Sequence, residues 1–167
     1  MQYVALIVAL FFATPAAAAS FDAPKRKSGL WEIKMSSGQA KDMPSMQQCV
    51  EEKTDDPTKM AGSQKMQCSK NEMRKEGDKI VAESVCKVEN STAKTRAVFA
   101  GRFDSAYKVD IKTTYEPPLS GMKETSSVIE AKWLGQCKAG QKPGDISMPG
   151  MPNINMDEMR KGATKQP

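Results

Sequence analysis

Hydrophobic and polar residues alternate with a period of two along several stretches of the chain. In residues 29–35, with the sequence GLWEIKM, the side chains of Trp31, Ile33 and Met35 fall on one side, and the residues between them are mostly polar. Side chains on a β-strand point alternately to the two faces of a sheet. The pattern is therefore typical of an antiparallel strand that covers a core on one face. We expect Trp31 to be a core residue rather than a ligand-stacking one.

Similar alternation in later segments predicts a β-rich fold. It is clearest from Tyr107 to Tyr115, and Pro117-Pro118 is expected to end this strand because proline cannot donate a ladder hydrogen bond. Gly77 suits the tight turn of a hairpin between two of the segments. We expect strands at residues 29–35, 45–50, 68–75, 79–87, 93–100, 107–115 and 126–134. The predicted fold is mainly β: an antiparallel meander of six to seven short strands, curled into a sandwich or partial barrel.

One or two short helices are expected beside the strands. Asp56-Pro57 is suited to a helix start, with proline at the first helical position. Asn155 with Glu158 three residues later resembles a capping box for a short helix through Arg160.

The ends of the chain differ in composition from its middle. Residues 4–13 are an apolar run, and Ala17 and Ala19 follow at the critical positions of an A-x-A cleavage site. The run is shorter than the ~20 apolar residues that span a bilayer. We therefore expect a cleavable signal peptide at residues 1–19 and no membrane span. The β domain is expected at residues 20–137, and residues 138–167 are expected to form a tail rich in Gly, Pro and Met, with a short helix.

Four cysteines indicate two structural disulfides: Cys49, Cys68, Cys86 and Cys137. No C-x-x-C motif is present, so neither a thioredoxin-like redox site nor a zinc ribbon is indicated. Only 39% of the residues are hydrophobic, and a small core of this kind gains from cross-links.

The pairing of the cysteines is left open by the sequence. Cys68 and Cys86 are equidistant from Gly77 and could face each other across the hairpin, which leaves Cys49 for Cys137. Alternatively, Cys49 could reach Cys68 across the short loop between them, which leaves Cys86 for Cys137. A simple meander places Cys137 far from the others in both cases. We favour Cys49–Cys68 with Cys86–Cys137.

The order of these features resembles the bacterial DUF3617 family. The resemblance rests on Gly29, Leu30 and Trp31 after a basic segment, on the four cysteines in this order, and on the segment WLGQC at residues 133–137. It extends over essentially the whole mature chain. It implies a β-rich domain that is periplasmic or secreted after cleavage of the signal peptide. The function of this family is unknown, so the resemblance implies no catalytic residues.

Composition makes several chemistries improbable. The chain has no histidine, which removes Ser-His-Asp and Cys-His catalytic systems and the commonest zinc ligand. The formal net charge is +5, but basic and acidic residues are interleaved and no aromatic–basic pattern indicates nucleic acid. We expect no enzyme activity and no cofactor.

Methionine is the one enriched residue type, with 12 in the chain. Three M-x-x-M pairs occur: Met43 and Met46, Met148 and Met151, Met156 and Met159. Thioethers are soft ligands that suit Cu(I), so one hypothesis is a periplasmic Cu(I)-binding protein. The alternative, which we favour, is that methionine fills irregular gaps in a small core and in loops.

A second hypothesis is a cup for a lipid or another apolar molecule. A curled sheet with one apolar face can form such a cup, lined by Trp31, Tyr107, Ile111 and Trp133. The favoured alternative is that these side chains simply pack against one another. A third possibility is a module that docks on another envelope protein. The sequence thus favours a binding or structural role over catalysis.

Overall fold

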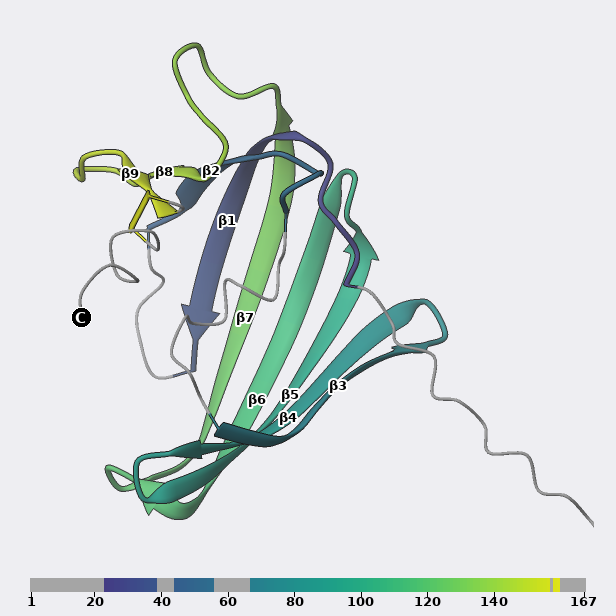
Figure 1. Ribbon diagram of the computed structural model, residues 1–167, viewed down its shortest axis with the longest axis vertical. Helices are drawn as coiled ribbons and strands as arrows, with labels where there is room; N and C mark the ends of the chain where they lie inside the picture. Colours follow the sequence, from purple (N-terminus) through teal and green to yellow (C-terminus); the bar gives the residue numbers. More distant parts are fainter. Residues whose placement is uncertain (1–22, 39–43, 56–66, 157, 160–167) are drawn as a thin grey trace, which may run out of the picture.

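A computed structural model describes residues 23–38, 44–55, 67–156 and 158–159. In these ranges the chain forms one open antiparallel sheet with the strand order β3-β4-β5-β6-β7-β1-β2-β8-β9 (Figure 1). The strands are β1 Gly29–Ser37, β2 Met46–Val50, β3 Gln67–Glu76, β4 Lys79–Val88, β5 Ser91–Arg102, β6 Ala106–Leu119, β7 Met122–Gly135, β8 Asp145–Ser147 and β9 Ile154–Asn155.

The mainly β, antiparallel fold is confirmed, but its extent differs from the prediction. Nine strands form one open sheet, where six to seven short strands in a sandwich or partial barrel were expected. The sheet twists, so that β3 and β4 run at an angle to β1 and β7 (Figure 1). The two extra strands, β8 and β9, lie in the segment that was expected to be a tail without strands. They are three and two residues long, too short to leave a periodic pattern.

β6 is also longer than predicted. It continues through Pro117 and Pro118 to Leu119 instead of ending before them. The ladder with β7 shifts its register between Thr114 and Leu119, so neither proline has a register partner in β7. A proline is tolerated at a strand position where no backbone N–H is needed for a hydrogen bond to the neighbouring strand.

No helix is among the elements of the described residues, although Met156, Glu158 and Met159 have helical backbone within the helix predicted from Asn155 through Arg160. Asp56-Pro57 lies outside the described ranges, as do Arg160 and the residues after it. The predicted capping contact is present, because the backbone N–H of Glu158 donates to Asn155 Oδ1 at 3.0 Å. No helix in the described part of the chain is long and apolar enough to cross a membrane.

The core lies on one face of the sheet. Trp31 is fully buried, with 0% of its surface exposed, and its indole N–H donates to the carbonyl of Lys27 at 2.8 Å. Its ring lies 5.7 Å from that of Tyr107, on which Phe103 stacks at 4.6 Å. The buried cluster consists of Trp31, Ile33, Val50, Tyr107, Val109 and Ala131. The role predicted for Trp31 is thus confirmed.

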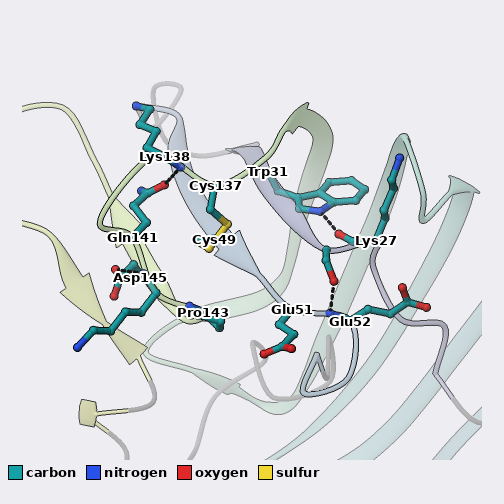
Figure 2. The surroundings of a disulfide bond; sticks show 12 residues. Lys27, Trp31, Cys49, Glu51, Glu52, Cys137, Lys138, Gln141, Pro143 and Asp145 are labelled. Atoms are coloured by element: carbon teal, nitrogen blue, oxygen red, sulfur yellow. Dashed lines mark hydrogen bonds between the residues drawn. A yellow bond between two sulfur atoms is a disulfide. The ribbon is translucent and has the colours of Figure 1, made fainter.

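The position of β1 decides how the cysteines pair. β1 lies between β7 and β2, so Leu30 has Cys49 as its register partner on one side and Gly135 on the other. Cys137 follows Gly135 by two residues and bonds to Cys49 across β1 (Figure 2). Cys68 and Cys86 are register partners in the β3–β4 hairpin and form the other disulfide.

The favoured pairing, Cys49–Cys68 with Cys86–Cys137, is therefore wrong, and the alternative is correct. The prediction assumed a simple meander, in which neighbouring strands are consecutive in the sequence. In the structure β1 lies beside β7, which comes much later in the chain. Disulfides persist in oxidising compartments outside the cytoplasm, so the two bonds indicate an extracytoplasmic environment. The predicted signal peptide at residues 1–19 lies outside the described residues and stays a prediction.

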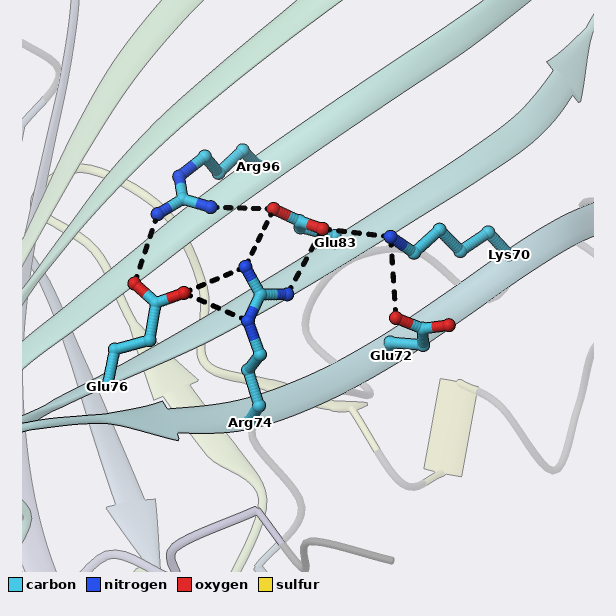
Figure 3. A network of polar contacts seen from close by, with 6 residues as sticks. All are labelled: Lys70, Glu72, Arg74, Glu76, Glu83 and Arg96. Atoms are coloured by element: carbon cyan, nitrogen blue, oxygen red, sulfur yellow. Dashed lines mark hydrogen bonds and ion pairs between the residues drawn. The ribbon is translucent and has the colours of Figure 1, made fainter. Parts of the chain in front are cut away.

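The opposite face of β3, β4 and β5 carries a network of ion pairs (Figure 3). At its centre Glu83 is 2.6 Å from Arg96, 2.9 Å from Lys70 and 3.1 Å from Arg74. Glu72 and Glu76 complete the network by pairing with the same three cations. Hydrogen bonds from Arg74, Lys70 and Arg96 hold the pKa of Glu83 well below its usual value of 4.5. The three cations and three carboxylates of this network thus balance one another.

The two disulfides are expected to differ in their effect on stability. Replacing Cys49 and Cys137 together by alanine should lower the free energy of unfolding by about 4–5 kcal/mol, and replacing Cys68 and Cys86 by about 3 kcal/mol. The reason is that the first bond joins residues 88 apart and the second joins residues 18 apart. Urea denaturation of both double variants measures the difference. An equal loss, or a larger one for the hairpin bond, would contradict this account.

Acid should destabilise the protein partly through Glu83. A carboxyl whose folded pKa is depressed stabilises the fold above its unfolded pKa, and this contribution is lost as the pH falls toward the folded pKa. The wild type should therefore lose stability progressively below about pH 5, and Glu83→Gln should lose less over the same window. Thermal melts between neutral and acidic pH test this, with Glu124→Gln, in a single exposed pair with Lys112, as the control. Parallel curves for wild type and Glu83→Gln would refute it.

Candidate functional site

The three residues GLW, from which the resemblance was first drawn, have structural roles. Gly29 adopts a φ of +136°, and a Cβ there would collide with the carbonyl oxygen of Gly135 and the indole nitrogen of Trp133. Leu30 is buried between β2 and β7, and Trp31 is in the core. Glycine is therefore needed for the close approach of β1 to the end of β7. These three residues stabilise the fold, and a functional site would lie elsewhere in the chain.

The predicted aromatic cup does not form. Trp31 and Tyr107 are buried against each other, and Ile111 and Trp133 pack against the same cluster. Trp133 donates its indole N–H to the carbonyl of Ser28 at 3.1 Å, and the Lys27 ammonium lies 3.9 Å from the centre of its ring. The four side chains thus fill the core, which is the alternative that we favoured. Tyr107 borders a cavity of about 410 Å³, and none of the four lines a second cavity, whose walls include Met46 and Met148.

That cavity has a volume of about 520 Å³ and lies between β1 and β2 on one side and the segment of β8 and β9 on the other. Its position follows from the register: Met46 pairs with Ile33 in β1, and Gln48 pairs with Trp31 in β1 and with Ile146 in β8. β1, β2 and the residues next to them supply Arg26, Met35, Met46, Gln48, Cys49, Val50, Glu51, Thr54 and Asp55, and the C-terminal segment supplies Pro143, Gly144, Ile146, Met148, Ile154, Met156 and Met159.

Methionine is the commonest residue in this lining. Four of the five methionines belong to the predicted pairs, namely Met46, Met148, Met156 and Met159, and the fifth is Met35. The M-x-x-M spacing itself is not what assembles them. Met151 is 52% exposed and does not line the cavity, and Met43 lies outside the described residues.

Sequence analysis did not predict Met35 as a cavity residue, although the alternation of apolar and polar residues placed it on the correct face of the strand. The period of two places Met35 on the same face as Trp31 and Ile33, and its partial burial beside the core agrees with that. Only the pairing of β1 with β2, and of β2 with β8, reveals that this face continues into a cavity.

One wall of the cavity carries a buried ion pair. Arg26 is 1% exposed, and its guanidinium donates to Asp55 at 2.7 Å and 3.1 Å and to Gln48 at 3.0 Å. The backbone N–H of Arg26 also donates to Asp55, at 2.8 Å. Burial opposes the charge of Arg26, but the hydrogen bond and the negative charge of Asp55 outweigh it and raise the pKa of the guanidinium. Both ions are therefore satisfied by each other within the protein.

Sequence analysis did not single out Arg26 and Asp55. The first lies in a basic run and the second in an acidic stretch, patterns that are usually solvated surface. They meet because β1 and β2 are adjacent, which brings the residues before β1 close to the residues after β2.

The cavity has a mostly apolar lining with one polar wall. Aliphatic and thioether groups form most of its surface, and Arg26, Gln48 and Asp55 form a polar wall. Within the described ranges, no group of three or more His, Cys, Asp or Glu side chains is placed to hold a metal ion. The thioethers are the groups that could take a soft metal.

Comparison with known proteins places the chain in a family. The family model described as "Protein of unknown function (DUF3617)" matches residues 26–137, well over half of the chain. The match begins at the buried Arg26, contains all four cysteines and ends at Cys137, so β8 and β9 lie beyond it. The chain matches no curated protein and no solved structure. It follows from the family match that this disulfide-bonded β domain belongs to the DUF3617 family.

Proposed function

We propose that the protein is an extracytoplasmic binding module whose ligand is an apolar small molecule, held in the methionine-lined cavity. The observation that supports this is the cavity itself. Its volume of about 520 Å³ lies within the range of roughly 300–1,000 Å³ that is typical of small-molecule sites. Such sites also combine mostly apolar walls with a few polar groups.

The two kinds of wall suggest how a ligand is held. Methionine side chains are flexible and polarisable, so they adapt to apolar molecules of different shapes. Arg26, Gln48 and Asp55 form a polar wall. A ligand with one polar end would be oriented with that end toward this wall. An apolar or amphiphilic molecule with a flexible body fits this arrangement best.

Binding is favoured over catalysis for two reasons. The chain has no histidine, the side chain that most often acts as general acid or base near neutral pH. The charged groups that are buried in the cavity wall, Arg26 and Asp55, are bonded to each other. A ligand that enters would meet a saturated ion pair rather than a reactive group.

The location is proposed from two observations together. The signal-peptide pattern at residues 1–19 and the two disulfides support a location in the periplasm, or secretion. Docking on another envelope protein is compatible with this location, and the cavity is the observation that makes a small ligand the preferred proposal.

A charge placed in the cavity should weaken the binding of an apolar probe. N-phenyl-1-naphthylamine is expected to fluoresce on binding to the wild type, and Met148→Glu should weaken its affinity at least tenfold, or about 1.4 kcal/mol. Desolvation of a carboxylate opposes an apolar ligand beside it. Met151→Glu is the matched control, because this neighbouring methionine is exposed and outside the cavity. Thermal melts establish that both variants are folded. Equal affinities for the two variants would place the site elsewhere.

Cu(I) binding is the second candidate function. It is favoured by one observation, namely that methionines from all three M-x-x-M pairs, joined by Met35, line the same cavity. Thioethers stabilise Cu(I), and all four cysteines are in disulfides, so no thiol competes.

Replacement of the thioethers by leucine should separate the two candidates. A variant with Met46→Leu, Met148→Leu, Met156→Leu and Met159→Leu keeps the volume and apolar nature of the lining. If copper is the ligand, this variant should lose Cu(I) in an anaerobic competition with bicinchoninate and still bind the fluorescent probe. Met122→Leu with Met151→Leu, both exposed, is the control. Unchanged Cu(I) affinity in the fourfold variant would rule out copper in this cavity.

A further inference from the structure

The second wall of the cavity is attached to the sheet by short ladders. β8 pairs with β2 at two positions only, Gln47 with Ser147 and Gln48 with Ile146. β9 pairs with β8 at two positions, and among the described strands it has no other neighbour. By contrast, the ladder of β6 with β7 is continuous from Ala106 to Thr114. Short ladders with few buried contacts open at a lower free-energy cost than the central strands of a sheet.

The start of this segment, at Cys137, is fixed by a disulfide. Gly140, which follows it, can act as a hinge. The Cys49–Cys137 disulfide holds the start of the segment to β2 (Figure 2). Between that bond and β8, Gly140 and Gly144 have φ values of 84° and 89°, in the region that favours glycine. The backbone N–H of Gly144 donates to the carbonyl of Cys49 at 2.9 Å. A rotation within residues 138–141 would leave the disulfide in place, break the hydrogen bond between Gly144 and Cys49, and move residues 142–156.

The segment beyond the hinge is held together by its own contacts. The Asp145 carboxylate accepts hydrogen bonds from the backbone N–H of Lys142 at 2.7 Å and from the Asn155 amide at 2.6 Å. Asn155 also donates to the carbonyl of Pro143 at 3.2 Å, and the backbone N–H of Met156 donates to the carbonyl of Gly144 at 3.0 Å. β8 and β9 can therefore move as one unit.

The side of this unit that faces the sheet is apolar. Ile146, Met148, Ile154 and Met156 line the cavity opposite Met35, Met46 and Val50. A ligand enclosed between these walls would bury apolar surface on both sides, which favours the closed arrangement over the open one. The family match ends at Cys137, so this wall is supplied by residues outside the matched region.

We propose that residues 142–156 are a hinged lid, which swings away from β2 about residues 138–141, admits an apolar molecule to the cavity and closes over it. The lid rests on the proposed binding function, because it assigns a role to the wall of the same cavity. It differs from that function in what it requires: β8 must leave β2 for the ligand to pass.

A disulfide that fastens β8 to β2 tests the lid without touching the cavity. Gln47 and Ser147 are register partners, and neither lines the cavity. In a variant with Gln47→Cys and Ser147→Cys, association of N-phenyl-1-naphthylamine in stopped flow should be at least tenfold slower than in wild type. The two single variants, each with its added thiol blocked, are the matched controls. Mapping of disulfides by mass spectrometry verifies that the native pairs are retained.

A variant that loosens the lid should act in the opposite direction. Asp145→Ala removes the carboxylate that joins Lys142 to Asn155 and lines no part of the cavity. It should release the probe at least tenfold faster than wild type, with the melting temperature of the β domain nearly unchanged. Equal probe kinetics in the fastened variant, its controls and Asp145→Ala would overturn the lid and leave the binding function standing.

Amide hydrogen exchange gives a readout that does not depend on a ligand. The amides of residues 144–156 should exchange at least a hundredfold faster than those in the paired parts of β6 and β7, and the fastened variant should abolish this difference. Exchange as slow as that of β6 and β7 in the wild type would overturn the lid. Fast exchange in a protein that binds no probe would support the hinged opening and contradict the proposed apolar ligand.

Discussion

The insertion of β1 between β7 and β2 is the constraint on which the rest of this structure depends. It joins a strand near the start of the domain to one near its end, and it needs Gly29 where the two backbones approach. Once β1 is in place, Trp31 lies against Tyr107 in the core, and Cys49 comes within bonding distance of Cys137. The same pairing aligns Met35 and Met46 along the edge where the cavity begins.

The two faces of the sheet differ in the side chains that they carry. On the outer face, carboxylates and cations neutralise one another around Glu83, which leaves no unbalanced patch in that network for a charged partner. On the inner face, the core residues continue into the cavity, where the buried charge of Arg26 is matched by that of Asp55. The binding proposal rests on this mostly apolar cavity.

The sequence predicts what depends on neighbouring residues and fails where distant segments meet. Alternation located Trp31, the hairpin at Gly77 and most strands of the meander, since each pattern is local. The pairing of β1 with β7 joins residues about a hundred positions apart, and no period records it. The Cys49–Cys137 disulfide depends on that contact, and the Arg26–Asp55 ion pair and the cavity depend on the pairing of β1 with β2. β8 and β9 were missed because two or three residues carry no periodicity.

The central claim is that the cavity binds a small apolar molecule, and native mass spectrometry tests it most directly. The protein would be isolated from a periplasmic extract without denaturation and then incubated with a lipid extract of the same cells. This account predicts an added mass of one small organic molecule, which is lost when the protein is unfolded. A protein that remains bare after incubation would contradict the claim, and an added mass equal to a copper ion would favour the thioethers as metal ligands instead.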